Sequence, residues 1–262
     1  MKRKTIVTLI SGMLIMNAAA QIQWPAIKQE TKPWARWWWQ GSAVNKKDLS
    51  ASMEKYKAAG LGGLEITPIY GVQGYEKQFI NFLTPQWMQM LDYTLKEAKR
   101  MGLGIDIANG TGWPFGGPWI TNKDASKTFI YKTYELEGGK ELAEDIVYKQ
   151  EGFVRTANNK QVDVNRVADP IAANKNLQEL ALDQVKFPLQ LPLELLMAYS
   201  DKGAIVNLTT NVGENGKLSW KAPDGKWTLV ALFQGLHGKM VERAAPGGEG
   251  YAIDHFSASA LS

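Results

Sequence analysis

The chain has 262 residues, contains no cysteine and carries a formal net charge of +4 with a sequence pI near 9.0. The lack of cysteine excludes disulfides, thiol catalysis, Cys-based metal sites and a lipoprotein anchor. Three of the basic residues are Lys2, Arg3 and Lys4, so the rest of the chain is close to neutral and lacks the positive charge of a nucleic-acid-binding domain.

Residues 1–20 have the composition of a secretory signal peptide. The basic residues precede an apolar run at 6–16, which is followed by Ala18, Ala19 and Ala20. This run is shorter than the roughly 20 residues that a membrane helix needs, and no other segment approaches that length. We therefore expect cleavage near Ala20 and a mature protein that is periplasmic or secreted and has no membrane span.

Three apolar segments that resemble strands alternate with two amphipathic helical patterns in the next part of the chain. Asn45 and Thr84 are suited to N-cap these helices, and Gly60 and Gly102 are suited to end them. Strand, helix, strand, helix, strand is the order of a parallel sheet with crossover helices. The strands are expected at 33–44, 61–69 and 103–110.

The character of the sequence changes after Trp119. Residues 128–234 alternate polar and apolar positions with period two, and turn sequences such as GENG and PDG separate the alternating runs. This pattern predicts a β-rich module. The chain then passes through a glycine-rich stretch into a short apolar segment at 251–254, which is typical of a fourth strand.

Alternation within these four strands predicts one unusually acidic face. Leu64, Ile66 and their counterparts would point toward the covering helices. Carboxylates buried on the other face are costly unless they are paired, hydrogen-bonded or bound to a ligand or metal. That face would carry Arg36, Trp38, Gln40, Glu65, Thr67, Asp106, Ala108, Ala252 and Asp254.

The polar residues of this face differ in their position along the strands. Asp106 lies in mid-strand, which favours an internal ion pair with Arg36. Glu65, Asn109 and Asp254 lie nearer the carboxyl ends, where (β/α) barrels build their active sites, and this favours ligand binding. A Glu65–Arg36 pair is the alternative for Glu65, and an oxygen-bound cation such as Ca²⁺ is an alternative ligand for the carboxylates.

The segment IDIANGTGWPFGGPW, residues 105–119, places tryptophans directly after these polar residues. Aromatic rings beside carboxylates and an amide suit a sugar, because a ring covers the apolar C–H face while polar groups bind the hydroxyls. Trp113 and Trp119 could instead fill the mouth of a barrel. This structural role is favoured for Trp119, whereas both roles stay open for Trp113.

Other chemistries fit the sequence less well. In GTGWPFGG the third glycine of a dinucleotide-binding motif is replaced by Phe115, and Pro114 would disturb the following helix. No nucleophile elbow and no P-loop lysine motif occurs. His237 and His255 are the only histidines, too few for a three-His zinc site, and we expect no organic cofactor.

The chain contains five long and specific segments, which are, in chain order, PWARWWWQGSAV, GLGGLEITPIYG, EAKRMGLGIDIANGTGWPFGGPW, LSWKAPDGKWTLVALFQG and ERAAPGGEGYAIDHFS. Together these segments resemble glycoside hydrolase family 106, the bacterial α-L-rhamnosidases, and the resemblance covers most of the mature chain. The resemblance implies a (β/α)8 barrel with β-sandwich insertions, inversion at the anomeric carbon and a calcium ion near the bound sugar.

The family's members are much longer than this chain, and their two catalytic glutamates lie on later barrel strands. No residue here therefore inherits the acid or base role, and the catalytic residues stay unassigned. The resemblance carries over only sugar-pocket roles. The candidate substrate-binding residues are Arg36, Glu65, Asn109, Trp113 and Asp254.

The sequence thus predicts an α/β fold, a partial (β/α)8 TIM-type barrel of about four strands with an inserted β-sandwich-like module. The expected function is the amino-terminal part of a secreted, inverting α-L-rhamnosidase that acts on rhamnose-containing plant or microbial polysaccharides and is inactive in isolation. The alternatives are a non-catalytic carbohydrate-binding protein and a truncated product without function. The expected parts are a signal peptide at 1–20, barrel at 21–127, β-rich module at 128–235 and barrel again at 236–262.

Overall fold

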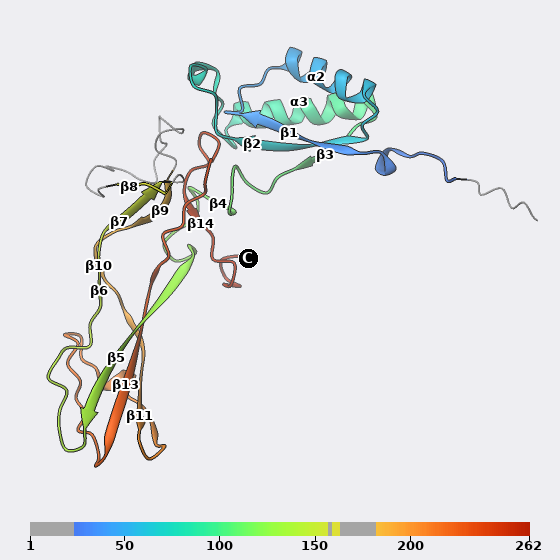
Figure 1. Ribbon diagram of the computed structural model, residues 1–262. Coiled ribbons are helices and arrows are strands. Elements are labelled where there is room, and N and C mark those ends of the chain that lie inside the picture. Colours follow the sequence, from blue (N-terminus) through green and yellow to red (C-terminus); the bar gives the residue numbers. More distant parts are fainter. Residues whose placement is uncertain (1–23, 157–158, 163–181) are drawn as a thin grey trace, which may run out of the picture.

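The computed structural model describes residues 24–156, 159–162 and 182–262. The predicted signal peptide lies outside these residues. The described chain is elongated, with a helix-covered sheet at one end and long antiparallel strands at the other (Figure 1). Among the described helices, none combines the length and hydropathy needed to span a membrane.

A three-stranded parallel sheet forms the first end. Its strands are β1 (Trp34–Gln40), β2 (Gly63–Ile69) and β3 (Gly104–Ile107), in the order β1-β2-β3. The helices α2 (Lys46–Ala58) and α3 (Pro85–Met101) cover one face of this sheet (Figure 1). The alternation of strands and helices predicted for this part of the chain is therefore confirmed.

The predicted helix caps are also confirmed. The Asn45 side chain accepts a hydrogen bond from the Asp48 backbone N–H at 3.0 Å, and Thr84 caps α3 in the same way. Gly102 ends α3 in the left-handed conformation, with φ of 70°. Glycine adopts this conformation without the steric cost that a Cβ would add.

The core of this end lies between the sheet and the two helices. Trp37, Trp39, Leu64 and Ile66 point from the strands toward the helices, as the alternation predicts. Burying large apolar side chains in this way is the main favourable contribution to folding, at about 25 cal/mol per Å². The fully buried partners on the helices are Leu49, Met53 and Trp87.

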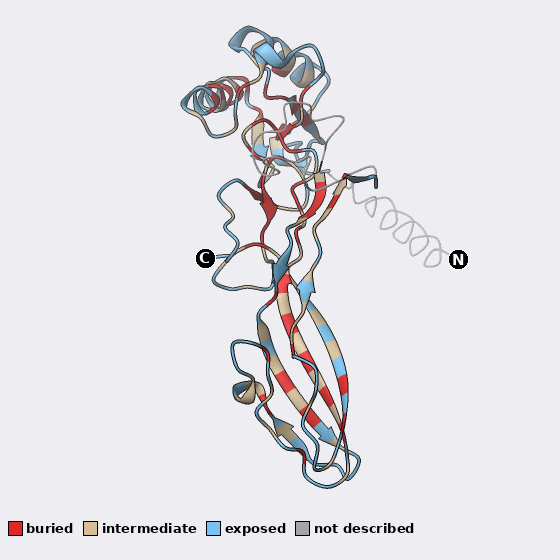
Figure 2. Ribbon diagram, turned by 90° about the vertical axis from the view of Figure 1, so that its left-hand side faces the viewer, coloured by how far each residue is buried: buried red, intermediate tan, exposed pale blue. Residues whose placement is uncertain are grey.

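The second end is an antiparallel sheet in the order β12-β11-β13-β5. Along β13 buried positions alternate with partly exposed ones, which Figure 2 shows as bands on the ribbon. The period-two pattern of the sequence therefore forms strands here. The bounds are β5 (Lys127–Glu137), β11 (Leu193–Ser200), β12 (Ile205–Asn207) and β13 (Lys226–Leu236).

Small sheets and single turns make up the remaining elements. The small sheets have the orders β8-β7-β9, β10-β6 and β14-β4. Their strands are β4 (Gly116–Gly117), β6 (Lys149–Gln150), β7 (Phe153–Thr156), β8 (Gln161–Val162), β9 (Leu182–Lys186), β10 (Leu189–Gln190) and β14 (Tyr251–Ala252). Single turns of 3₁₀ helix are η1 (Gln29–Thr31), η2 (Glu76–Gln78) and η4 (Thr209–Asn211).

The predicted partial (β/α)8 barrel is wrong. The described residues form five separate sheets with two α-helices and no closed barrel, so the fold is richer in β structure than expected. Parallel strands need a long crossover connection, usually a helix, but β3 runs directly into a glycine-rich loop. The expected fourth strand does not join β3, because β14 pairs antiparallel with β4.

Glycines explain this pairing. A Cβ on Gly116 would lie 2.1 Å from the Tyr251 carbonyl oxygen, and a Cβ on Gly250 would lie 2.1 Å from the Gly117 carbonyl oxygen. The two backbones approach each other this closely only because side chains are missing. The glycines on both sides of the contact thus favour β14 beside β4 over a fourth parallel strand.

Candidate functional site

An ion pair lies on the face of the parallel sheet opposite the helices. Arg36, Glu65 and Asp106 are neighbours in the strand register of β1, β2 and β3. Arg36 Nε donates to Glu65 Oε2 at 2.8 Å, and Arg36 Nη2 donates to Glu65 Oε1 at 3.4 Å. Of the two pairings considered from the sequence, the structure therefore contains Arg36–Glu65.

This face is open to solvent, contrary to the expectation of a buried acidic interior. The side chains of Arg36 and Glu65 are 45% and 32% exposed, and Asp106 is exposed as well. The reason is the missing barrel, since the described residues contain no further parallel strands to enclose the face. The cost of burying these carboxylates therefore does not arise.

Two tryptophans lie beside the Arg36 guanidinium. Its central carbon is 5.5 Å from the ring centre of Trp38 and 5.8 Å from that of Trp113. The two indole rings meet edge to face, with centres 6.1 Å apart, and both are nearly half exposed. These distances are within the range of cation–π attraction, which orients the guanidinium and the rings together.

The backbone around Trp113 is held by a distant part of the chain. Glu242 N–H donates to the Trp113 carbonyl oxygen at 2.8 Å, and Trp113 N–H donates to the Glu242 carbonyl oxygen at 3.3 Å. A Cβ on Gly112 would lie 2.2 Å from the Glu242 oxygen, so this approach requires glycine. The peptide bond between Trp113 and Pro114 is cis.

Four of the five predicted substrate-binding residues line one pocket of about 280 Å³, which we call the first pocket. Arg36 and Glu65 come from strands, whereas Asn109 and Trp113 come from the loop after β3. The pocket therefore combines a cation, a carboxylate, an amide and an aromatic ring. Its wall is completed by Ile107, Ala108, Gly110, Gly112 and Phe115.

Asp254 lies apart from this pocket. Its Oδ1 accepts a hydrogen bond from Phe256 N–H at 3.0 Å, and its own N–H donates to the Asp124 carbonyl oxygen at 2.8 Å. The carboxylate therefore stabilises the turn after β14. A substrate-binding role for Asp254 stays a prediction that this geometry does not support.

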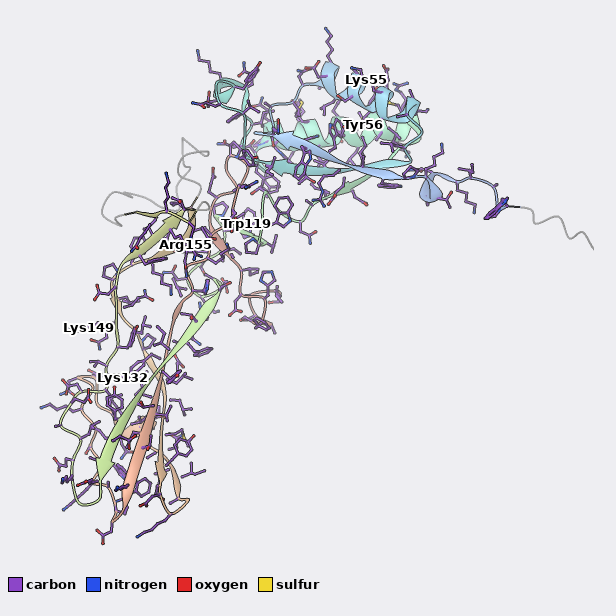
Figure 3. All side chains as sticks on the ribbon, in the orientation of Figure 1. Lys55, Tyr56, Trp119, Lys132, Lys149 and Arg155 are labelled. Carbon is purple, nitrogen blue, oxygen red and sulfur yellow. The ribbon has the colours of Figure 1, made fainter. Side chains whose placement is uncertain are left out.

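Trp119, labelled in Figure 3, lies on the segment between the two ends of the molecule and does not line the first pocket. Its ring centre is 6.3 Å from that of Phe82. It is 43% exposed, close to the 46% of Trp113. The two tryptophans of the loop thus have similar exposure but different surroundings.

A second pocket of about 590 Å³ is also lined by Trp113. Tyr70, Glu242 and Arg243 contribute to it, and sequence reasoning gave none of them a role. Tyr70 N–H donates to the Arg243 carbonyl oxygen at 3.0 Å. The ERAAPGGEGYAIDHFS segment contains two of these residues, but nothing in the sequence shows that it packs beside the loop at 113. The lining residues are Trp38, Gln40, Ile69, Tyr70, Trp113, Pro114, Glu242 and Arg243.

Glu242 belongs to a network of four charges. Lys239 Nζ binds both Glu242 and Asp183, and Arg155 Nε, from β7, donates to Asp183 Oδ2 at 2.6 Å (Figure 3 labels Arg155). Asp183 is buried. Burial acts to raise the pKa of Asp183, but hydrogen bonds with Lys239 and Arg155 outweigh it and hold the pKa below its usual value.

The histidines lie outside both pockets. Burial lowers the pKa of His237, and neighbouring lysines lower it further. His255 Nδ1 lies 2.9 Å from the Ile253 carbonyl oxygen. Neither ring is placed to act on a ligand in either pocket.

Calcium binding stays a prediction for the described residues. No group of three or more His, Asp or Glu side chains suited to a metal occurs in the described part of the chain. The oxygens of Glu65 are bound by Arg36, and Asp254 stabilises a turn. We therefore assign no calcium ligand to these residues.

Exposed indole rings beside an arginine–glutamate pair and an amide, in a concave pocket, suit a carbohydrate ligand. The model of the Glyco_hydro_106 family, alpha-L-rhamnosidase, matches residues 26–188 and 190–262. The chain belongs to this family of glycoside hydrolases.

Two known proteins resemble the chain. It is 27% identical over 250 residues to the "Putative beta-glucuronidase" of Formosa agariphila, covering 90% of this chain and 20% of that protein. Its fold resembles that of the rhamnosidase from Novosphingobium sp. PP1Y, with a TM-score of 0.57, 16% identity and coverage of 90% of this chain and 36% of the other. The chain thus spans well under half the length of both relatives.

Proposed function

We propose that this chain supplies part of the sugar-binding region of a secreted, inverting α-L-rhamnosidase acting on rhamnose-containing plant or microbial polysaccharides. The observation that carries the proposal is the first pocket, in which Arg36, Glu65, Asn109 and Trp113 meet. The family and the pocket together support a sugar ligand. Secretion is supported by the composition of residues 1–20.

The chemistry of the first pocket suits a deoxy sugar. The exposed face of Trp113 offers apolar contact to ring C–H groups and to a methyl substituent such as that of rhamnose. Arg36 and Asn109 supply donors for hydroxyl groups, and the Glu65 carboxylate accepts from them. The Arg36–Glu65 pair holds both side chains in position before the sugar arrives, which lowers the entropic cost of binding.

The catalytic pair is proposed to lie elsewhere in the complete enzyme. Inverting hydrolysis uses one carboxylic acid to protonate the leaving oxygen and one carboxylate to activate water, roughly 6.5–9.5 Å apart. Glu65 is the carboxyl group of the first pocket, and both of its oxygens accept hydrogen bonds from Arg36. This bonding suits a positioning role, so the isolated chain is expected to bind rhamnosides without cleaving them.

A non-catalytic carbohydrate-binding protein is the second candidate. The same observation favours it, since a pocket whose carboxylate is paired can hold a sugar without reacting with it. Release of rhamnose from an aryl rhamnoside by the complete protein separates the two candidates. Turnover by the isolated chain that is lost in Glu65→Gln would instead assign catalysis to Glu65.

Binding of methyl α-L-rhamnoside to the purified protein, followed by ligand-observed NMR, tests the proposal. Trp113→Ala should weaken binding about tenfold, the equivalent of about 1.4 kcal/mol, because it removes the aromatic ring proposed to contact the sugar. Trp119→Ala is the matched control, because Trp119 has similar exposure but lies outside the pocket, and it should leave binding unchanged. Folded wild-type protein that does not bind the rhamnoside would refute the proposal.

A further inference from the structure

The second pocket has the size and lining of a sugar site in its own right. Its volume of about 590 Å³ lies within the roughly 300–1,000 Å³ that ligand pockets occupy. Three aromatic residues, Trp38, Tyr70 and Trp113, line it together with Gln40. Trp113 also lines the first pocket, so the two pockets share this residue.

The lining of the second pocket carries one positive charge that no carboxylate of the described residues neutralises. Glu242 is its acidic lining residue, and Lys239 neutralises it. Lys239 and Arg155 also neutralise the buried Asp183, so the network of two cations and two carboxylates has no net charge. Arg243 is the remaining charged residue of the lining, and within the described part of the chain it forms no ion pair.

Arg243 is held in an unusual backbone conformation. Its φ is 58°, in the left-handed region that residues with a Cβ rarely adopt. The contacts around it maintain this conformation, since Tyr70 N–H donates to the Arg243 carbonyl and the preceding residue, Glu242, is bonded to Trp113. The guanidinium carbon lies 5.9 Å from the Tyr70 ring centre. Such conformations are concentrated at functional sites.

We propose that the second pocket binds the sugar unit adjacent to the one in the first pocket, that this unit is a uronic acid, and that Arg243 binds its carboxylate. The proposal rests on the proposed function, because it takes the first pocket as a sugar site. A guanidinium matches a planar carboxylate with two parallel hydrogen bonds. Trp38 and Tyr70 offer ring faces to the pyranose while Gln40 binds a hydroxyl.

Three probes that differ only at C6 test the assignment in the purified protein. They are methyl β-D-glucuronide, methyl β-D-glucoside and methyl β-D-glucoside 6-sulfate, each titrated by ligand-observed NMR. Wild-type protein should bind the glucuronide about tenfold more tightly than the neutral glucoside, which is typical for a charge-assisted hydrogen-bonded pair. The preference should shrink as salt is raised, because the site is open to solvent.

Variants of Arg243 identify the residue responsible. Arg243→Gln should abolish the preference for glucuronide and leave binding of methyl α-L-rhamnoside unchanged, whereas Arg243→Lys should keep part of the preference. Lys55→Gln is the matched control, because it removes one exposed positive charge from α2, away from both pockets (Figure 3). It should leave every affinity unchanged.

Each contrary outcome has a distinct meaning. Equal binding of glucuronide and glucoside by the wild type would overturn the proposal, and tighter binding of the sulfate would overturn the choice of a uronic acid. A preference that survives in folded Arg243→Gln would overturn the role of Arg243. If Arg243→Gln does not fold, the role of Arg243 is tested by the salt dependence of the wild-type preference and by the preference of Arg243→Lys. Loss of rhamnoside binding alone would count against the proposed function, since the glucuronide arm is measured separately.

Discussion

The guanidinium carbon of Arg36 lies 5.8 Å from the ring centre of Trp113, and Trp113 lines both pockets. Arg36 comes from β1, whereas Trp113 follows β3 and is bonded to Glu242, much later in the chain. The site thus depends on three segments that are distant in sequence. A substitution in any of these segments should alter ligand binding. Its effect on the free energy of unfolding should depend on how deeply the substituted side chain is buried.

Loss of the Arg36–Glu65 pair should affect binding more than stability. Both side chains are partly exposed, and exposed ion pairs contribute about 0–1 kcal/mol. Arg36→Gln and Glu65→Gln should therefore each lower the free energy of unfolding by less than about 1 kcal/mol while weakening rhamnoside binding several-fold. Urea unfolding and NMR titration measure the two effects. A large loss of stability with intact binding would contradict this assignment.

Asp106→Ala should leave stability almost unchanged. A buried Asp106 paired with Arg36 would make its removal cost about 3–5 kcal/mol, but Asp106 is exposed and Arg36 pairs with Glu65. Surface substitutions of this kind usually lie within about 0.5 kcal/mol of wild type. Thermal unfolding of the two proteins side by side checks this. A decrease of several kcal/mol would show that Asp106 is buried in solution.

Asp183→Asn should be strongly destabilising, since it removes the carboxylate between Arg155 and Lys239. Breaking a buried pair by removing one partner costs about 3 kcal/mol or more. The pKa of Asp183 is lowered in the folded protein, so its contribution to stability is present above the ordinary aspartate pKa and is lost as pH falls below about 4. Urea unfolding from pH 6 to pH 2 should show a shallower pH dependence for the variant. The same pH dependence of stability in the wild type and in Asp183→Asn would contradict a stabilising role for this ion-pair network.

Glu249 should have the opposite pH dependence. It is half-buried, and burial raises its pKa despite hydrogen bonds from the backbone of the 247–249 loop. For a carboxyl group whose folded pKa is raised, the folded state binds the proton more tightly, so stability falls as pH rises from the unfolded pKa through the folded one. Glu249→Gln should therefore stabilise the protein at pH 7, and the gain should disappear near pH 3. A constant difference at both pH values would rule out this cause.

The local structure of the parallel sheet was predictable from the sequence, whereas its surroundings were not. Asn45, Thr84 and Gly102 act at helix ends through contacts within a few residues, and strand alternation places Trp37 and Trp39 in the core. Helix ends and the facing of strand residues are determined by the local sequence pattern. Among the described residues, the expected fourth parallel strand is missing because β14 pairs with β4 and not with β3. Periodicity does not encode which distant strands pair.

The candidate site likewise contains residues that the sequence predicted and residues that it could not predict. Arg36, Glu65 and Asn109 follow from strand alternation and from position near a carboxyl edge, and they do meet in one pocket. Tyr70 and Arg243 could not be assigned, because they become neighbours through backbone hydrogen bonds between remote loops. Asp254 fits the same sequence pattern as Glu65 but lies elsewhere, since its strand does not join the parallel sheet.

The backbone conformation of Arg243 provides a last prediction, which compares two substitutions at the same position. Arg243→Asn and Arg243→Gln both remove the guanidinium and should both abolish the preference for glucuronide. The left-handed conformation costs an ordinary residue roughly 1–2 kcal/mol, whereas asparagine adopts it more readily. With φ of 58° at this position, Arg243→Asn should be more stable to urea than Arg243→Gln by about 0.5–1 kcal/mol. Since both variants lose the same charge and the same contact with Tyr70, the difference isolates the backbone. Equal stabilities would mean that the loop relaxes out of this conformation in solution, and the guanidinium would then not be held over the second pocket.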